Sequence, residues 1–341
     1  MSFLHTYFPS QILISFGPFA VHWYGLFMML GIAAGYAIAR RNFSRAHLPV
    51  TVLNDLFIYL VLCGFVGARL YHVLNELPLY WEHPLWIFAI WRGGLAIHGA
   101  LLAGVIVIWF FIRKHSDVYD KVINNSQREG CKLQDTITRK IPITNIQRPR
   151  LFLISYFLFL ADLLAPSVAL GQAIGRWGNY FRQELFGPPT NLPWGIPIDA
   201  AHRLSDFMQY EYFHPVFLYE SVWLFIVCIV LLGMLHAVIP GLTRDPERKN
   251  KNRFSLRFWI PACAGMTVKK YRPGLVFFLY LILAGLGRFF IEFLRIDPMP
   301  LIFGIRLQQL VSLLLMGVGF SGIVLLYRKL NKKNGIPLQI F

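Results

Sequence analysis

The chain has 341 residues, of which 56% are hydrophobic and only 15% are charged, and its mean hydropathy is +0.52. Because an average soluble domain carries about 25% charged residues, this composition excludes a soluble globular enzyme and predicts an integral membrane protein. The formal net charge of +16 raises nucleic-acid binding as an alternative. The positions of the basic residues decide between the two readings of that charge.

Seven apolar segments reach or approach the roughly 20 residues that a helix needs to cross a bilayer core. These candidate spans lie at about residues 19–39, 52–74, 95–112, 151–175, 215–238, 274–294 and 307–327. The predicted fold is therefore all-α, a polytopic integral membrane protein with about seven transmembrane helices, a small outer-face segment and two cytoplasmic loop insertions. A single membrane-embedded domain over residues 1–341 is the simplest architecture.

Most of the Lys and Arg residues follow the first, third, fifth and seventh candidate spans, so they fall on one face of the membrane. They form four patches at residues 40–47, 113–150, 240–272 and 328–334. The positive-inside rule then places the N-terminus of this multi-pass protein outside and the C-terminus in the cytoplasm. The basic charge is thus a topology signal with a contact to anionic membrane lipids, and no nucleic acid is expected as a partner.

Two polar stretches interrupt the pattern of spans. Residues 115–150 and 239–270 combine dense basic charge with little apolar periodicity, which predicts solvated insertions. The four cysteines form no recognisable metal or disulfide framework, and no metal or other cofactor is expected. The first residues lack the basic region and small-residue cleavage site of a signal peptide, so the first span is expected to stay in the membrane.

A polar stretch at residues 171–187 directly follows the fourth apolar segment. It contains Arg176, Asn179, Arg182 and Glu184 together with four glycines, in a place where hydrocarbon side chains would otherwise continue. Ionised groups and free backbone cannot be left unpaired at membrane depth, so such a stretch is expected to face protein or a water-filled cavity. The sequence therefore predicts a site here.

A second polar stripe ends the sixth span, where Arg288, Glu292 and Arg295 follow one another at i, i+4 and i+7 and share one helix face. Facing lipid would be very costly for these groups, so the stripe is expected to face inward. Further polar residues at the predicted outer ends of the spans are Tyr24, Arg69, Tyr219, Glu220, which is expected to pair with an arginine, and Gln309. The alternative is an internal salt-bridge network that only joins helices.

An excess of guanidinium groups in a partly dry site suits the recognition of phosphate, because arginine offers several planar donors and stays charged. A phospholipid headgroup is the natural anion at this depth. His98, which enters the third span flanked by Gly99, is a candidate functional residue, because an ionisable group inside a membrane often marks a site. A satisfied structural histidine is the alternative.

These motifs, taken in chain order, resemble those of bacterial prolipoprotein diacylglyceryl transferases over essentially the whole chain apart from the two insertions. The matching residues are His22-Trp23-Tyr24-Gly25, Gly93-Gly94 with His98-Gly99, Ala161-Asp162 with Pro166, Gly175-Arg176-Trp177-Gly178-Asn179-Tyr180 with Glu184 and Gly187, His214-Pro215 with Tyr219-Glu220, and Arg288-Phe289-Phe290-Ile291-Glu292 with Arg295.

The resemblance implies an inner-membrane transferase that moves the diacylglyceryl group of phosphatidylglycerol to the lipobox cysteine thiol of prolipoprotein signal peptides. A thioether forms, glycerol phosphate leaves, and no cofactor is needed. His98, Arg176 and Arg288 are the implied catalytic residues. His98 is the candidate general base, since an imidazole has an ordinary pKa of about 6.5, and thiolate formation promoted by the arginines alone is the alternative. The implied phosphatidylglycerol-binding residues are Tyr24, Arg176, Asn179, Glu184, Gly187, Arg288, Glu292 and Arg295.

The sequence departs from the family pattern at three positions. Arg182 stands where an asparagine is common, Ala100 where a glycine is common, and Ala284 where a tyrosine precedes the arginine of the sixth span by four residues. A polytopic transporter of an anionic solute is the rival hypothesis, because its site would also be rich in arginine. The sequence shows no inverted repeat, and the charges gather at the predicted outer ends of the spans rather than midway.

Overall fold

The computed structural model describes residues 2–17, 19–46, 48–89, 96–114, 148–238, 272–297, 301–302 and 304–334. The chain divides into two compact units, the first formed by Met1–Asn42 with Ala161–Phe341 and the second by Phe43–Leu160. Both predicted insertions fall almost entirely outside the described residues, so their character and the prediction of one domain over residues 1–341 stay predictions.

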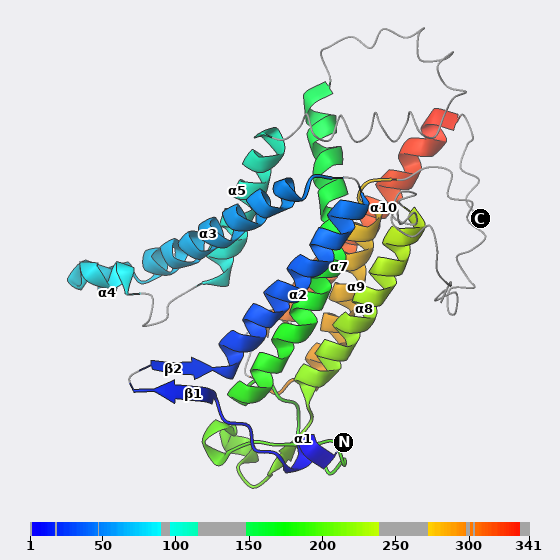
Figure 1. Cartoon of the computed structure of the whole chain (residues 1–341). Coiled ribbons are helices and arrows are strands. Elements are labelled where there is room, and N and C mark those ends of the chain that lie inside the picture. Colours follow the sequence, from blue (N-terminus) through cyan, green and yellow to red (C-terminus); the bar gives the residue numbers. More distant parts are fainter. Residues whose placement is uncertain are drawn as a thin grey trace, which may run out of the picture. The chain divides into compact units, whose positions relative to one another are not determined.

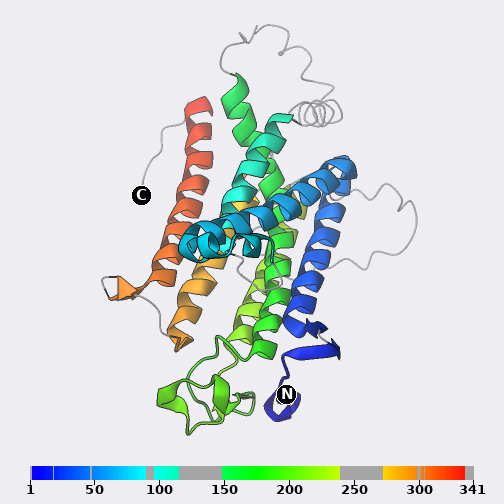
Figure 2. The same cartoon turned by 90° about the vertical axis from the view of Figure 1, so that its left-hand side faces the viewer.

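Long helices build the first unit, and Figures 1 and 2 show them side by side. They are α2 (Trp23–Arg45), the part of α7 (Arg148–Arg182) from Ala161 onward, α8 (Val216–Val238), α9 (Leu275–Ile291) and α10 (Leu307–Asn334). Helix α2 approaches α7 at Gly31, where an added Cβ would lie 2.7 Å from the carbonyl oxygen of Gly171. Such small residues let helix backbones come close, as is usual between membrane helices.

The second unit pairs α3 (Val50–Asn75) with α5 (Ile97–Lys114), and α4 (Leu77–Glu82) and the 3-10 helix η1 (Pro84–Phe88) lie between them in sequence. The side chain of Arg69 in α3 is buried in this unit. Its guanidinium donates hydrogen bonds to the carbonyl oxygens of Ile87, at 2.9 Å, and Ala89, at 3.4 Å, and it lies over the ring of Tyr80. Arg69 thus holds the C-terminal end of η1.

Short elements complete the described chain. They are α1 (Ser2–Thr6), the antiparallel pairs β1–β2 (Ile12–Phe16, Phe19–His22), β3–β4 (Ile196–Pro197, Tyr212–Phe213) and β5–β6 (Leu301–Ile302, Ile305–Arg306), and the 3-10 helices η4 (Ala200–His202), η5 (Ser205–Phe207) and η7 (Glu292–Leu294). The segment between α7 and α8 has a small core in which Ile196, Ile198 and Phe213 pack with aromatic residues at the end of α7. This core fixes the segment against the end of the helix that carries the polar stretch.

The predicted all-α polytopic membrane fold is confirmed. Each of the seven candidate spans coincides largely with a helix, and five of the described helices are long and apolar enough to cross a bilayer: Val50–Asn75, Ile154–Arg182, Val216–Ala237, Leu275–Leu294 and Leu307–Arg328. The count of seven spans stays a prediction, since α2 and α5 are not among these five. The first helix also begins four residues later than predicted, because residues 19–22 pair with β1 as a strand.

Asp162 caps helix α9 from the neighbouring helix α7. Its fully buried carboxylate accepts hydrogen bonds from the backbone N–H groups of Gly274 and Phe277, both at 2.7 Å. The first N–H groups of a helix have no partner within the helix, so a carboxylate at this end satisfies them and also interacts favourably with the helix dipole.

We expect Asp162→Ala to lower the free energy of unfolding by about 1–2 kcal/mol, the usual effect of losing a helix cap. Thermal unfolding of the purified protein in detergent measures this change. Asp162→Asn keeps an acceptor oxygen, so its free energy of unfolding is expected to fall by less than that of Asp162→Ala. Equal melting temperatures for Asp162→Ala and the unchanged protein would show that the cap contributes nothing.

Candidate active site

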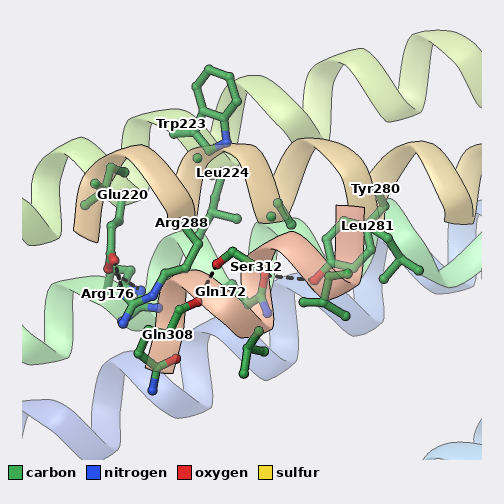
Figure 3. Close-up of a pocket in the computed structure, with 16 residues that line it drawn as sticks. Gln172, Arg176, Glu220, Trp223, Leu224, Tyr280, Leu281, Arg288, Gln308 and Ser312 are labelled. Carbon is green, nitrogen blue, oxygen red and sulfur yellow. Dashed lines mark hydrogen bonds and ion pairs between the residues drawn. The ribbon is translucent and has the colours of Figure 1, made fainter. Parts of the chain in front are cut away.

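A cavity of about 260 Å³ lies between α7, α8, α9 and α10 of the first unit (Figure 3). Gln172 and Arg176 line it from α7, Glu220 and Trp223 from α8, and Arg288 from α9. Charged groups gather at one end, and apolar side chains of α9 and α10, such as those of Leu281 and Leu315, line the rest. A cavity with one charged end and apolar walls fits an amphiphilic ligand.

Glu220 joins the two arginines at the charged end of the cavity. Its Oε2 lies 2.8 Å from Nε of Arg176, and its Oε1 accepts a hydrogen bond from Nη1 of Arg288. The Glu220 carboxylate is buried, whereas the side chains of Arg176 and Arg288 are 29% and 22% exposed. One buried carboxylate therefore orients two partly exposed guanidinium groups at the charged end of the cavity.

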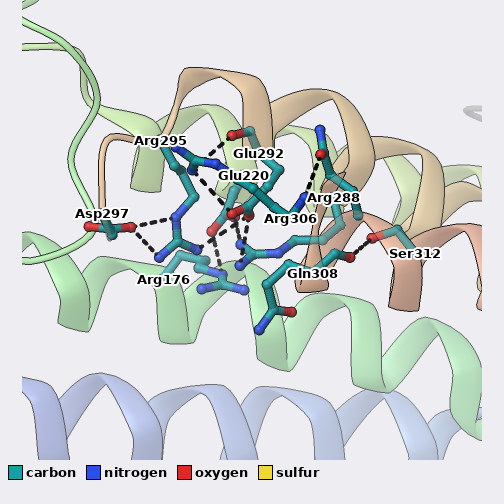
Figure 4. Close-up of polar contacts among 10 residues, drawn as sticks. Arg176, Glu220, Arg288, Glu292, Arg295, Asp297, Arg306, Gln308 and Ser312 are labelled. Atoms are coloured by element: carbon teal, nitrogen blue, oxygen red, sulfur yellow. Dashed lines mark hydrogen bonds and ion pairs between the residues drawn. The ribbon is translucent and has the colours of Figure 1, made fainter. Parts of the chain in front are cut away.

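Glu292 forms a second centre of ion pairs beside the first centre, which is Glu220 with its two arginines (Figure 4). Its side chain is 0% exposed, with Nη2 of Arg288 at 3.2 Å and Nη1 of Arg295 at 4.0 Å from Oε2, and Nη1 of Arg306 at 3.4 Å from Oε1. Arg295 is held further by Asp297, whose Oδ2 lies 2.6 Å from its Nη2 and 2.8 Å from its Nε. The inward-facing stripe of Arg288, Glu292 and Arg295 is thus confirmed.

The two centres form one arginine cluster, in which four guanidinium groups face three carboxylates. Its members are Arg176, Glu220, Arg288, Glu292, Arg295, Asp297 and Arg306. The cluster has an excess of one positive charge when all its groups are ionised. A salt-bridge network that only joined helices would be most stable with equal numbers of positive and negative groups, because an uncompensated charge is costly away from water. The excess favours a site that is completed by an anion.

The chain turns sharply where α7 ends. Gln183 and Leu185 both adopt left-handed backbone conformations, with φ of +52° and +60°. Nδ2 of Asn179 donates to Oε1 of Glu184 at 2.8 Å, and the other carboxylate oxygen lies 3.4 Å from Nε of Arg182. Non-glycine residues hold such conformations only when surrounding contacts enforce them, which occurs often at functional sites.

Comparison with known proteins shows the family to which the chain belongs. A family model described as prolipoprotein diacylglyceryl transferase matches residues 11–125 and 150–325. The chain belongs to that family. Residues 126–149, inside the first predicted insertion, are not covered by the match. The rival hypothesis of an anion transporter is set aside, because the prolipoprotein diacylglyceryl transferase family consists of transferases by its description.

Curated relatives have the same description over nearly their full lengths. A phosphatidylglycerol–prolipoprotein diacylglyceryl transferase of a Nostoc species is 33% identical over 327 residues, which cover 96% of this chain and 92% of that protein. One from a Synechocystis species is 36% identical over 319 residues, with coverages of 94% and 90%. One from Gloeobacter violaceus is 34% identical over 322 residues, with coverages of 94% and 94%.

Several residues predicted for the diacylglyceryl transferase site have contacts that shape its surroundings. The guanidinium of Arg182 lies 5.3 Å from the ring centroid of Tyr24, in addition to its ion pair with Glu184. A Cβ on Gly187 would lie 2.8 Å from both Cβ of His214 and the carbonyl oxygen of Leu294. Gly187 therefore allows a close backbone approach, and contacts of these residues with the lipid stay predictions.

The general base predicted for the transferase lies in the second unit. The backbone of His98 belongs to the first turn of α5, whose bounds are Ile97–Lys114. The side chain of His98 lies outside the described part of the structure. Its convergence with Arg176 and Arg288 therefore stays a prediction, and so does that of Arg69.

Sequence reasoning missed two members of the arginine cluster, Asp297 and Arg306. Asp297 follows Arg295 by two residues, and Arg306 precedes Gln309, whose Oε1 accepts from the backbone N–H of Arg306 at 3.3 Å. Both lie at the same predicted membrane face as the stripe of Arg288, Glu292 and Arg295. Their position in the sequence could therefore have identified them as candidates. Tyr219, by contrast, forms a hydrogen bond to a residue outside the cluster. Its hydroxyl accepts this bond from Nε1 of Trp194 at 3.0 Å.

Proposed function

We propose that this chain transfers the diacylglyceryl group of phosphatidylglycerol to the lipobox cysteine of prolipoproteins, with the arginine cluster as the phosphate-binding part of its active site. The family supports the reaction. The observation that carries the site assignment is the bridging of Arg176 and Arg288 by the single buried carboxylate of Glu220, at the charged end of a cavity with apolar walls.

The reaction makes two chemical demands on the site. The acceptor thiol must lose its proton, because the thiolate is the nucleophile. The thiolate sulfur then attacks the phosphate-bearing carbon of the diacylated glycerol. The bond between this carbon and the phosphate oxygen breaks, and the electron pair stays on that oxygen in the departing glycerol phosphate. A thioether between the lipid and the acceptor cysteine remains.

Arg176 and Arg288 meet the second demand. Negative charge grows on the bridging phosphate oxygen as the bond breaks, and guanidinium groups that are already oriented stabilise this charge without reorganising. Glu220 supplies that orientation through its bonds to both arginines. Asn179 and Glu184 fix the turn after α7, and we assign them a role in shaping the site.

His98 is the proposed general base that accepts the thiol proton. We expect His98→Gln to lower kcat/KM roughly 100-fold or more, within the usual range for a lost general base. We also expect the rate of the unchanged enzyme to rise with pH as a general-base imidazole becomes neutral, and His98→Gln to lack this rise. A His98→Gln profile that matches the unchanged enzyme in shape and height would remove His98 from this role, and the arginines alone would then promote thiolate formation.

We further propose that the protein lies in the bacterial inner membrane with its N-terminus outside and its C-terminus in the cytoplasm. The basic patches after alternate spans support this orientation. It places the end of α7 and the arginine cluster at the outer face, where secreted prolipoproteins arrive.

A lipidation assay tests the proposed function. Purified protein, vesicles of phosphatidylglycerol and a peptide with a lipobox cysteine should give a peptide whose mass increases by one diacylglyceryl group, with an equal amount of glycerol phosphate. A cysteine-to-serine peptide is the matched control and should stay unmodified. Failure to form the thioether, under conditions in which a relative forms it, would overturn the proposal.

A further inference from the structure

A polar pair from α7 and α9 lies along the same cavity, away from its charged end. The hydroxyl of Tyr280 donates a hydrogen bond to Oε1 of Gln172 at 3.0 Å, and both residues line the cavity (Figure 3). Gln172 precedes Arg176 by one helical turn, and Tyr280 precedes Arg288 by two turns. The pair therefore lies on the same faces of its two helices as the arginines do.

The position of Gln172 within the span makes it unusual. It lies ten residues before the end of α7 at Arg182, or about 15 Å along the helix at 1.5 Å per residue. This is about half the thickness of a bilayer core, where an amide without partners is costly. The bond from Tyr280 satisfies the amide oxygen. Among the contacts that the structure describes, no hydrogen bond is made by Nε2 of Gln172, which carries two N–H donors.

Phospholipids that differ in the link to their chains offer different partners for such a donor. An acyl ester has a carbonyl oxygen, which accepts hydrogen bonds, whereas an ether link has no carbonyl. In a diacyl glycerophospholipid the ester carbonyls are separated from the phosphate by the glycerol carbons. One helical turn, about 6 Å for four residues, separates Gln172 from Arg176 and is comparable with that separation.

We propose that Gln172 recognises an acyl ester carbonyl of the lipid donor through Nε2, with Tyr280 as the positioning residue that holds the amide in this orientation. The proposal rests on the proposed function, because it takes the phosphate to lie at Arg176 and Arg288. It makes Gln172 a specificity-determining residue that selects ester-linked over ether-linked glycerophospholipids. A purely structural role for the Gln172–Tyr280 bond is the alternative.

The test compares two lipids that differ only in this link. Dioleoyl phosphatidylglycerol and its dioleyl ether analogue are each offered with the same lipobox peptide to the purified full chain. A net hydrogen bond between neutral groups corresponds to roughly a threefold to tenfold preference. We expect the unchanged enzyme to prefer the ester lipid by that factor in kcat/KM, and Gln172→Met to lower the ester rate to near the ether rate while leaving the ether rate unchanged.

Two further variants separate recognition from structure. Tyr280→Phe removes the bond to Oε1 but keeps the ring, so the preference for the ester should shrink without a matching loss on the ether lipid. Gln308→Met is the control, since Gln308 lines the same cavity on α10 and should leave the ratio of the two rates unchanged.

The outcomes distinguish the two proposals. Equal losses on both lipids in Gln172→Met, or an unchanged ratio, would overturn the recognition of the ester by Gln172 and leave the transferase assignment standing. Absence of the thioether product with either lipid in the unchanged enzyme would overturn the proposed function itself.

Discussion

Replacing Arg176 by alanine is expected to lower kcat/KM for phosphatidylglycerol by roughly 100-fold to 1000-fold, the range found when one donor to a developing oxyanion is removed. Nε of Arg176 is held by Glu220 at 2.8 Å, and the side chain is 29% exposed at the charged end of the cavity. Its terminal nitrogens can therefore reach an anion while the group stays fixed. The steady-state rate of lipidation of a lipobox peptide measures the effect.

Arg176→Lys separates charge from geometry. Lysine keeps the positive charge but has no planar fork, so it cannot bind Glu220 and a phosphate oxygen at the same time in the same way. We expect it to recover only a small part of the lost rate. Full activity in Arg176→Lys would show that a point charge suffices and that the bridging by Glu220 is not needed for catalysis.

Arg182→Ala is the matched control on the same helix. The Arg182 side chain is 51% exposed, pairs with Glu184 and lies over Tyr24. Surface ion pairs contribute about 0–1 kcal/mol, so the rate should fall only a few-fold. A loss in Arg182→Ala as large as in Arg176→Ala would place Arg182 on the phosphate, and wild-type rates in Arg176→Ala would remove Arg176 from the proposed role.

The sequence was sufficient to predict the part of the arginine cluster that lies on one helix, because residue spacing alone determines which side chains share a helix face. Arg288, Glu292 and Arg295 share one face of any helix that contains them, and lipid is so poor a solvent for ions that this face had to point inward. The pairing of Glu220 with an arginine followed from the same cost. These predictions depended on local spacing and on the solvent, and the structure confirms both.

Long-range pairing was not predictable in this way. Nothing local in residues 12–22 shows that the first apolar stretch begins as a hairpin, because its alternation is short and runs directly into a helix. Arg306, at the end of β6, pairs with Glu292, which directly follows α9 and is 14 residues away in sequence. Residue spacing gives the face of a helix, but which neighbour covers that face depends on tertiary packing.

The polar pair of Gln172 and Tyr280 extends this argument to the whole cavity. The polar stretch at residues 171–187 includes Gln172, but the prediction of a site there depends on its charged residues, which begin at Arg176. Gln172 lies one turn earlier and has no charge, yet it faces the same cavity. A binding site for an amphiphile needs weak polar contacts along its apolar part as well as strong contacts at the headgroup, and the former leave little signal in sequence.

Glu292→Gln is expected to have the largest effect on stability. The carboxylate is fully buried and lies within 4.0 Å of three arginines, Arg288, Arg295 and Arg306. Removing one partner of a buried ion pair costs about 3–5 kcal/mol because the other charge stays buried without compensation. Here Arg306 would lose the carboxylate with which it pairs, whereas Arg288 would keep Glu220 and Arg295 would keep Asp297. The melting temperature in detergent should fall clearly, and the rate of lipidation should fall because Arg288 keeps Glu220 but loses its second carboxylate partner.

Asp297→Asn is the control for Glu292→Gln, because it also neutralises a carboxylate of the same cluster. The Asp297 side chain is 22% exposed and pairs with Arg295. Solvent can therefore compensate part of the lost charge, and the fall in melting temperature should be markedly smaller. The melting temperature of Glu292→Gln could equal that of the unchanged protein or be no lower than that of Asp297→Asn. Either result would show that the cluster tolerates its full positive charge without a central carboxylate. The excess of guanidinium groups would then no longer argue for a bound anion.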